Sequence, residues 1–297
     1  MAAKRLIVNA DDFGFTSGVN RGIVEAHSKG IVTCATLMAT GPAFDGAAKL
    51  AGVYRQLSVG CHILLVDGNS LQPASEIPSL VSSHGNKLRK SVVDFAIAAL
   101  RGRIGARDVV TEACAQIAKL QSAGVSVTHV DSHKHTHMFP AVFEPLLRAA
   151  RECGVRAVRN PFVPLKPLAF SHLVKQPKLW TRYSEVRLLR CFAQQFRKSC
   201  ADLGMITTDG SIGIVATGRL KARLFQAILA SVPAGTWEFV CHPGYSDSEL
   251  ERANTRLRRS REVELELLTC PETKALLTKY SILLTSYREL TDEARAN

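Results

Sequence analysis

The amino-acid sequence predicts an α/β protein with a (β/α) barrel-like fold. Short apolar, β-branched runs alternate with segments of helical periodicity along most of the 297 residues, as in parallel strands joined by covering helices. About seven strand candidates favour a closed or partly closed barrel over an open doubly wound sheet. The glycine-rich GxGxxG motif of dinucleotide-binding sheets does not follow the first strand. We therefore expect a single barrel-like domain over residues 1–297.

The elements of the first half follow from periodicity and from residues that start or stop helices. Leu6 to Ala10 is a short apolar run and forms the first expected strand. Ser17 is the expected N-cap of the next helix, which ends at Gly30. The alternation continues with a strand over 31–38, a helix over 43–51, a strand over 57–65, a helix over 109–120 and a strand over 125–131.

The second half contains one break in this alternation. A helix is expected over 141–153, and Pro145 should confine its regular part to the residues that follow the proline. Residues 162–200 carry several prolines and are expected to form an irregular insertion packed on the barrel. The other expected elements are a strand over 155–159, a helix over 219–232, a strand over 236–241, a helix over 261–268 and a strand over 281–285.

The chain is strongly basic, with a formal net charge of +12. The excess is concentrated in two stretches, 85–107 and 166–198, where the only acidic residues are Asp94 and Glu185. Such stretches are usually solvated faces, but they can also attract an anionic membrane surface. Nucleic acid is not an expected partner, because no zinc finger, RNP-type motif or basic zipper accompanies them.

The sequence also bears on the cellular compartment. No run of about eighteen apolar residues predicts a membrane span. The apolar run after the N-terminal MAAKR is too short for the h-region of a signal peptide. The eight cysteines form no CxxC pair, which argues against structural zinc and a disulfide framework. A cytoplasmic enzyme is therefore the expected class.

A histidine cluster marks the end of the strand expected over 125–131. On an extended chain, positions two apart share a face. Asp131, His133, His135 and His137 would then point the same way for as long as the backbone stays extended. Such a cluster at a strand end is more typical of a functional site than of core packing.

Two adjacent carboxylates, Asp11 and Asp12, follow the first strand. On an extended chain they point to opposite sides, so one could ligate a metal while the other acts as a base; helix capping is the alternative. His62 at the end of the third strand is weak evidence taken alone. Functional side chains of parallel α/β folds gather at the carboxyl ends of strands, and Asp12, His62 and His133 all lie at such ends.

These residue types suit metal-assisted hydrolysis. One carboxylate and two imidazoles leave positions open for water or substrate, a pattern of catalytic metal sites. A cation held in this way polarises a carbonyl or lowers the pKa of bound water, which fits hydrolysis of an amide or ester. His242 lies at a further strand end, before a Pro-Gly turn, and could protonate a leaving amine.

The sequence resembles the YdjC-like carbohydrate deacetylases, the family of chitooligosaccharide deacetylase and the hopanoid-biosynthesis-associated deacetylases. The matching motifs are LIVNADDFG (6–14), GVNRGIVEAH (18–27), VGCHILL around His62, THVDSHKHTHMFP (128–140) and EFVCHPGY (238–245). They extend in order over most of the chain, and the weakest match is 162–200. The resemblance implies a barrel-like fold related to polysaccharide deacetylases and the removal of acetyl from an N-acetylated sugar.

The resemblance also implies roles for individual residues. One divalent metal ion, Mg²⁺ or Zn²⁺, would be held by Asp12, His62 and His133. Asp11 would be the general base and His242 the acid. Four further residues would orient the site or the sugar: His135, His137, Arg159 and Asp209.

The segment 62–81 looks more like the hopanoid-associated branch, which implies a glucosaminyl-type lipid head group as substrate in place of an oligosaccharide. The two basic stretches would then hold the enzyme near an anionic membrane, and a homodimer is a further option. Two other functions stay open. One is a metal-dependent phosphodiesterase or glycosidase on a similar barrel, and the other is a non-catalytic sugar- or lipid-binding protein.

Overall fold

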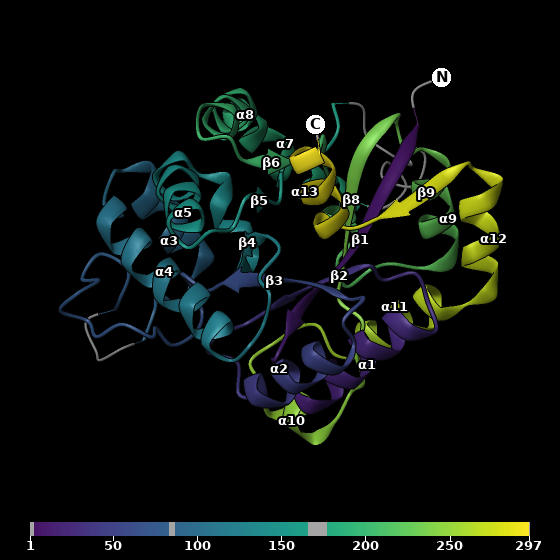
Figure 1. Ribbon diagram of the computed structural model, residues 1–297, viewed down its shortest axis with the longest axis horizontal. Helices are drawn as coiled ribbons and strands as arrows, with labels where there is room; N and C mark the ends of the chain where they lie inside the picture. The colour runs from purple at the N-terminus through teal and green to yellow at the C-terminus, as the bar shows by residue number, and fades with distance from the viewer. Residues whose placement is uncertain (1–2, 83–86, 166–176, 297) are drawn as a thin grey trace.

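The computed structural model describes residues 3–82, 87–165 and 177–296. Within these ranges, nine parallel strands form one sheet in the order β6-β5-β4-β3-β2-β1-β8-β7, with β9 paired to β1 (Figure 1). The strands are β1 (Lys4–Phe13), β2 (Cys34–Leu37), β3 (Ser58–Ile63), β4 (Val130–Ser132), β5 (Ala157–Val158), β6 (Ile206–Thr207), β7 (Gly210–Ile212), β8 (Gly235–Cys241) and β9 (Ile282–Thr285).

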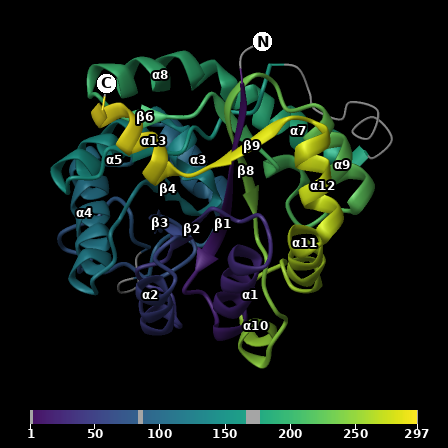
Figure 2. The same ribbon diagram turned by 45° about the vertical axis from the view of Figure 1, so that its right-hand side comes forward.

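Helices surround the sheet, with α3, α4 and α5 on one side and α9, α11 and α12 on the other (Figures 1 and 2). None of those in the described ranges is long and apolar enough to cross a bilayer. The α-helices are α1 (Ser17–Ser28), α2 (Phe44–Val53), α3 (Val92–Leu100), α4 (Ala106–Ser122), α5 (Pro140–Glu152), α7 (Pro177–Leu188), α8 (Ala193–Asp202), α9 (Ala222–Ala230), α10 (Ser248–Arg252), α11 (Arg259–Thr269), α12 (Pro271–Lys279) and α13 (Tyr287–Ala296). The described residues also form the short 3₁₀ helices η1 (His133–Met138), η2 (Leu189–Phe192) and η3 (Ile214–Ala216).

The two ends of the sheet meet. The strands β6 and β7 are separated in the chain only by Thr208 and Asp209, and this continuous segment pairs with β5 first and with β8 next. The backbone N–H of Ser211 also donates to the carbonyl of Phe162, just beyond β5, at 3.0 Å. The sheet therefore curls round on itself, which confirms the predicted barrel-like fold class.

The central strand β1 has neighbours on both edges. It pairs with β8 along one edge, while β9 and β2 share the other edge, β9 beside Lys4–Ile7 and β2 beside Asn9–Phe13. Every β1 residue from Leu6 onward is buried. Because both faces are covered, the polar residues at its carboxyl end lie in the interior and need partners there.

Two helices begin or continue differently from the sequence prediction. The N-cap of α1 is Thr16 and not Ser17, because the Thr16 hydroxyl accepts a first-turn N–H at 3.2 Å. The helix α5 begins at Pro140, where no donor is needed, and runs through Pro145 without a break. The prediction that Pro145 limits the regular part was therefore wrong. Fully buried neighbours such as Leu146 pack this helix on the core and offset the lost hydrogen bond.

The stretch 162–200 is more regular than its prolines suggest. Residues 166–176 lie outside the described part, and from Pro177 onward the chain forms α7, η2 and α8. Pro164 precedes α7 and Pro177 starts it, so neither of these two prolines interrupts a helix. Phe196 of α8 packs edge-on against Phe143 of α5, with ring centroids 5.4 Å apart. The described part of this stretch therefore shares the core of the barrel.

Candidate active site

Polar residues at the carboxyl ends of four strands lie together at one end of the barrel. Asp12 belongs to β1 and His62 to β3, while His133 directly follows β4 and His242 directly follows β8. These strands are close neighbours in the sheet order, so their ends meet. The structure thus brings together side chains that are up to 230 positions apart in the sequence (242 minus 12).

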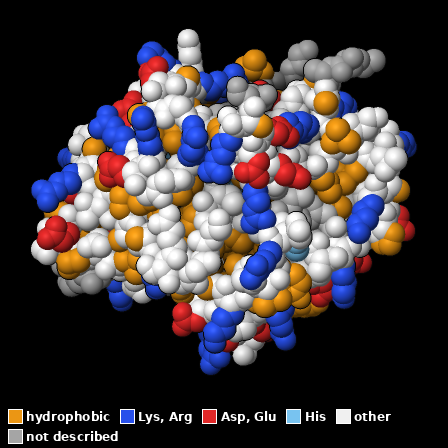
Figure 3. All heavy atoms as spheres, in the orientation of Figure 1, with side chains coloured by type: hydrophobic (Ala, Val, Ile, Leu, Met, Phe, Trp, Pro, Cys, Tyr) orange, Lys and Arg blue, Asp and Glu red, His pale blue; other side chains and the backbone are white. Residues whose placement is uncertain are grey.

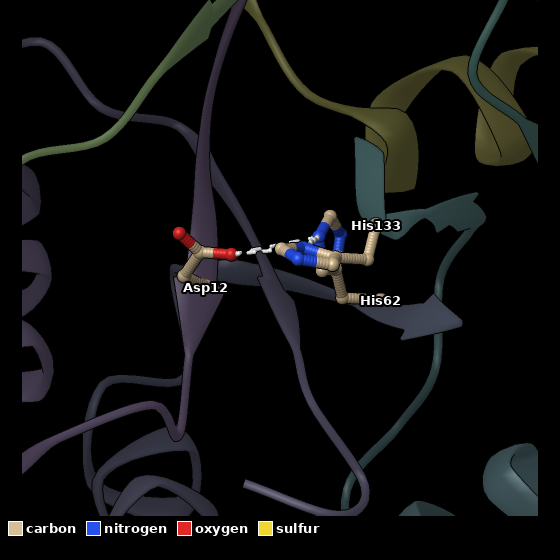
Figure 4. Close-up of side chains that lie close together, drawn as sticks. All are labelled: Asp12, His62 and His133. Atoms are coloured by element: carbon tan, nitrogen blue, oxygen red, sulfur yellow. Dashed lines mark hydrogen bonds and ion pairs between the residues drawn. The ribbon is translucent and has the colours of Figure 1, made fainter. Parts of the chain in front are cut away.

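Asp12, His62 and His133 face one another across a small space (Figure 4). The Oδ1 atom of Asp12 lies 3.6 Å from Nε2 of His62 and 3.5 Å from Nδ1 of His133. The two ring nitrogens are 3.3 Å apart. A tetrahedral ion with ligands at ~2.1 Å separates its ligand atoms by ~3.4 Å, so these three atoms fit one metal ion as they stand.

The backbone at the end of β1 separates the two adjacent carboxylates. Asp12 has a φ of 68°, which few residues other than glycine adopt. The register between β1 and β2 shifts between Ala10 and Phe13. Such irregularities often re-aim side chains beside active sites. As a result Asp12 faces the two histidines, whereas Asp11 faces a buried arginine.

His62 is held by a carboxylate beneath it. Its Nδ1 donates to Oδ1 of Asp131 at 2.7 Å, and the Thr36 hydroxyl donates to Oδ2 of Asp131 at 3.1 Å. Burial opposes a charged imidazole, but the Asp131 carboxylate outweighs it and raises the pKa of His62 to about 9. With Nδ1 occupied, Nε2 is the nitrogen available to a metal, and metal binding would displace a proton from it.

The guanidinium of Arg159 is fully buried among three carboxylates. It contacts both oxygens of Asp11 at 2.6 and 3.0 Å, one oxygen of Asp131 at 2.6 Å and one of Glu238 at 2.8 Å. The Tyr287 hydroxyl donates to the other Glu238 oxygen at 2.5 Å. Burial alone would raise the pKa of Asp11, but Arg159 outweighs it and holds that pKa well below its usual range. Asp11 is therefore ionised.

A second buried arginine fixes Asp12. The Nη2 group of Arg261, on α11, donates to Oδ2 of Asp12 at 2.6 Å, which leaves Oδ1 directed at the histidines. Burial raises the pKa of Asp12, but the Arg261 charge overcomes it, so the pKa lies well below the usual value. Nη1 of Arg261 is buried and has no hydrogen-bond partner among the described residues. The site thus contains a buried N–H donor, Nη1 of Arg261, that could bind a ligand atom.

His242 lies beside Asp11, with its Nε2 3.9 Å from Oδ2 of that carboxylate. Its backbone N–H donates to Glu264 at 2.6 Å, which fixes the turn after β8. Burial outweighs the attraction of the two aspartates and lowers the pKa of His242 to about 4. The imidazole is therefore neutral at neutral pH. Its buried Nδ1 has no partner within the described ranges.

The clustered histidines do not share one face, because the extended backbone on which that expectation depended ends at Ser132. It turns into η1 at His133, and Lys134 and His135 both have a φ of 54°. Two left-handed residues in succession remove the alternation of a strand. Only His133 joins Asp12 and His62. His137 is fully buried, with Nδ1 2.6 Å from the Ser132 hydroxyl, and the buried Nδ1 of His135 has no partner in the described part of the chain.

The buried state of His137 predicts acid lability. Burial lowers its pKa from the ordinary value of 6.5 to about 3, so the unfolded chain takes up the proton first and the fold loses stability as pH falls from 6.5 toward 3. Between about pH 6.5 and about pH 4.5 this lowers the free energy of unfolding by about 2 kcal/mol. The variant His137→Asn keeps a polar atom near the Nδ1 position but cannot take up this proton. Its free energy of unfolding should therefore fall less than that of the wild type, by this amount, over the same pH interval. Denaturant titrations at both pH values measure this, and equal losses in the two proteins would contradict it.

Asp209 does not lie at the site. Its Oδ2 accepts the backbone N–H of Thr236 at 2.8 Å, beside the first residues of β8. His242 follows the last residue of the same strand, so the two residues lie at opposite ends of β8. The geometry gives Asp209 a role in joining the β6–β7 segment to β8, and the structure does not support a role in orienting a sugar.

Three residues that shape the site were not anticipated: Asp131 as the partner of His62, Glu238 beneath Arg159, and Arg261 behind Asp12. Asp131 lies within the DSHKHTH motif, so its place beside the histidines was a usable signal. Glu238 opens the EFVCHPGY motif, which was likewise a usable signal, whereas nothing in the sequence distinguishes Arg261 from other charged residues of the chain.

The fold and the site together define an α/β barrel whose strand ends could hold one metal ion beside a second, ionised carboxylate. A family model described as YdjC-like protein matches residues 5–279. The chain belongs to this YdjC-like family, as its motifs indicated.

Named relatives match over nearly the full chain. A carbohydrate deacetylase of Geobacillus stearothermophilus is 31% identical over 95% of this chain and 96% of its own length. A chitooligosaccharide deacetylase of Serratia marcescens is 31% identical, with 97% and 99% covered. Among solved structures, an Enterococcus faecalis protein provisionally described as a cellobiose-phosphate cleavage protein is 25% identical, with a TM-score of 0.77 over 97% of this chain and 99% of that one.

Proposed function

We propose that the chain is a cytoplasmic, metal-dependent hydrolase that removes the acetyl group from an N-acetylated sugar, either an oligosaccharide or a glycolipid head group. Residues 1–297 form one catalytic domain, with 162–200 inserted in it. The observation that carries the proposal is the cluster of Asp12, His62 and His133 beside the ionised Asp11. The names of the relatives support the substrate class.

The ion is a transition metal such as Zn²⁺ in preference to Mg²⁺. Two of the three ligand atoms are imidazole nitrogens, whereas Mg²⁺ prefers oxygen ligands in an octahedron with neighbours only ~3.0 Å apart. When bound, such an ion polarises a carbonyl and lowers the pKa of a water molecule. The surrounding charges favour a cation, because four carboxylates outnumber two guanidinium groups: Asp11, Asp12, Asp131 and Glu238 against Arg159 and Arg261.

Asp11 and His242 move the proton. Asp11 accepts a proton from the attacking water, whose oxygen forms the new bond to the acetyl carbon. Because His242 is neutral at rest and stands 3.9 Å from Asp11, it can take over this proton and deliver it to the sugar nitrogen as the C–N bond breaks. The products are acetic acid and the amine, which exchange a proton to leave acetate and the ammonium form, and the water supplies the oxygen and both protons.

The other residues around the site position these groups. Arg159 orients Asp11 directly and acts on His62 through Asp131. His137 fixes η1 through its bond to Ser132. The unpartnered Nδ1 of His135 is available to a hydroxyl or acetamide group of the sugar.

Acetate release tests the proposed function. The purified protein should release acetate from N-acetylglucosamine oligomers, lose that activity with a chelator and regain it best with Zn²⁺. His133→Ala should lower both metal content and turnover, while His27→Ala, a histidine on α1 bonded to a backbone carbonyl, should change neither. Full metal content and activity in His133→Ala would show that the ligand set is wrong. Release of phosphate instead of acetate from sugar substrates would show that the reaction is wrong.

A further inference from the structure

The helix α3 exposes large apolar side chains to solvent. Val93, Ile97 and Leu100 are 62%, 43% and 62% exposed, and their spacing places them in one row along the outer face. We call these three residues the α3 stripe. On the opposite face Phe95 is fully buried. The helix is therefore apolar on both faces, with Asp94 as its only charged residue.

A surface helix of this kind is unusual. Surface helices of globular proteins normally present polar residues to water, and a helix that is apolar all round is normally buried. Single exposed apolar residues need no explanation, but a contiguous apolar row marks an interaction surface. The α3 stripe is such a row.

Five exposed basic residues flank α3 in the chain, and we call them the basic frame. None of these five basic residues makes an ion pair with another described residue, so their charge is free to attract an anionic surface. Figure 3 shows how widely basic side chains, with apolar groups between them, are spread over one face of the molecule. The exposed basic residues on either side of α3 in the chain are Lys87, Lys90, Arg101, Arg103 and Arg107.

The helix also lies at the same end of the barrel as the candidate active site. It belongs to the connection that leaves the carboxyl end of β3, and it packs against α5 and η1. The residue that opens η1 is His133. A surface that contacts α3 would therefore lie beside the strand ends that carry the metal ligands.

We propose that α3 docks this protein on an anionic lipid surface. The α3 stripe inserts at the boundary between head groups and acyl chains, and the basic frame binds the anionic head groups. Self-association through α3 is disfavoured, because a two-fold contact would bring two basic frames together. Docking on a lipid surface does not depend on the deacetylase reaction. It would, however, place the candidate active site next to a glycolipid head group.

Vesicle flotation tests the apolar part of the proposal. The wild type should float with mixed phosphatidylglycerol–phosphatidylcholine vesicles and stay behind with phosphatidylcholine alone. The triple variant Val93→Gln, Ile97→Gln, Leu100→Gln should bind at least about tenfold more weakly. The matched control Val53→Gln, Val263→Gln, Leu283→Gln changes equally exposed apolar residues elsewhere and should bind like the wild type. Equal binding by the α3 triple variant and the wild type would overturn the proposal.

A charge series tests the basic frame. Arg101→Gln, Arg103→Gln, Arg107→Gln should weaken anionic-vesicle binding about tenfold or more at low salt, while Lys49→Gln, Lys274→Gln, Lys279→Gln should not. Light scattering gives the oligomeric state of each variant. A wild-type dimer that the α3 triple variant converts to monomer, without vesicle binding by either, would assign the surface to a second copy and overturn the proposal. Because flotation needs no turnover, its outcome is independent of the acetate-release assay.

Discussion

An Asp11→Asn variant is expected to keep its metal ion and to lose roughly two to four orders of magnitude in kcat. The amide cannot accept a proton from water, yet it retains an oxygen that can accept from Arg159 in place of Oδ1. Steady-state acetate release gives kcat, and metal analysis of the same preparation shows whether the ion is still bound. His242→Ala should show a comparable loss, because the leaving nitrogen then lacks its proton donor.

The double variant sharpens this test. If one proton passes from Asp11 to His242, the two side chains act as a unit, and the double variant should be no slower than the slower single variant. Independent roles would instead give multiplied losses. If Asp11→Asn and His242→Ala both retained near wild-type kcat with metal bound, neither residue would have the role proposed for it.

The order of strands and helices was largely readable from the sequence because each local signal agreed with the fold. The apolar run at the start of β1 and the glycine after α1 are examples. Elements without a local signal were missed. The strands β6 and β7 contain two and three residues, too few to show a period. The helix α3 has apolar residues on both its buried and its exposed face, so hydrophobicity alone did not indicate which face lies in the core.

The part of the candidate site formed by residues at strand ends could be predicted from the sequence. Asp12, His62 and His133 could be grouped because parallel strands direct their carboxyl ends to one place. The path of the chain beyond a strand end was not predictable. Left-handed φ values at Lys134 and His135 sent the clustered histidines in different directions, and neither residue type requires that conformation.

Long-range charge pairs were equally hidden. Arg261 lies 249 positions from Asp12 in the sequence, and Arg159 lies 79 positions from Glu238. With 38 Lys and Arg residues in the chain, charge alone cannot indicate which of them are buried. The need for such partners was nevertheless implied, because a carboxylate at the end of a fully buried strand must be compensated.

The same compensation predicts that Arg159→Met will be the most destabilising single change at the site. It would leave Asp11, Asp131 and Glu238 buried without their shared cation, so the free energy of unfolding should fall by about 3–5 kcal/mol. Arg261→Met is the control, because its guanidinium is also buried but contacts a single carboxylate, Asp12, and should cost less. Denaturant unfolding of both variants in metal-free buffer compares them directly.

The pH dependence separates lost charge compensation from lost packing. Without Arg159 the buried carboxylates lack their compensating cation, so protonation relieves their burial and the deficit of Arg159→Met should shrink as pH falls. A packing defect would be the same at every pH. Adding Glu238→Gln to Arg159→Met removes one of the uncompensated charges and should restore part of the stability. A deficit that neither falling pH nor this second change reduces would mean that Arg159 acts by filling space and not by its charge.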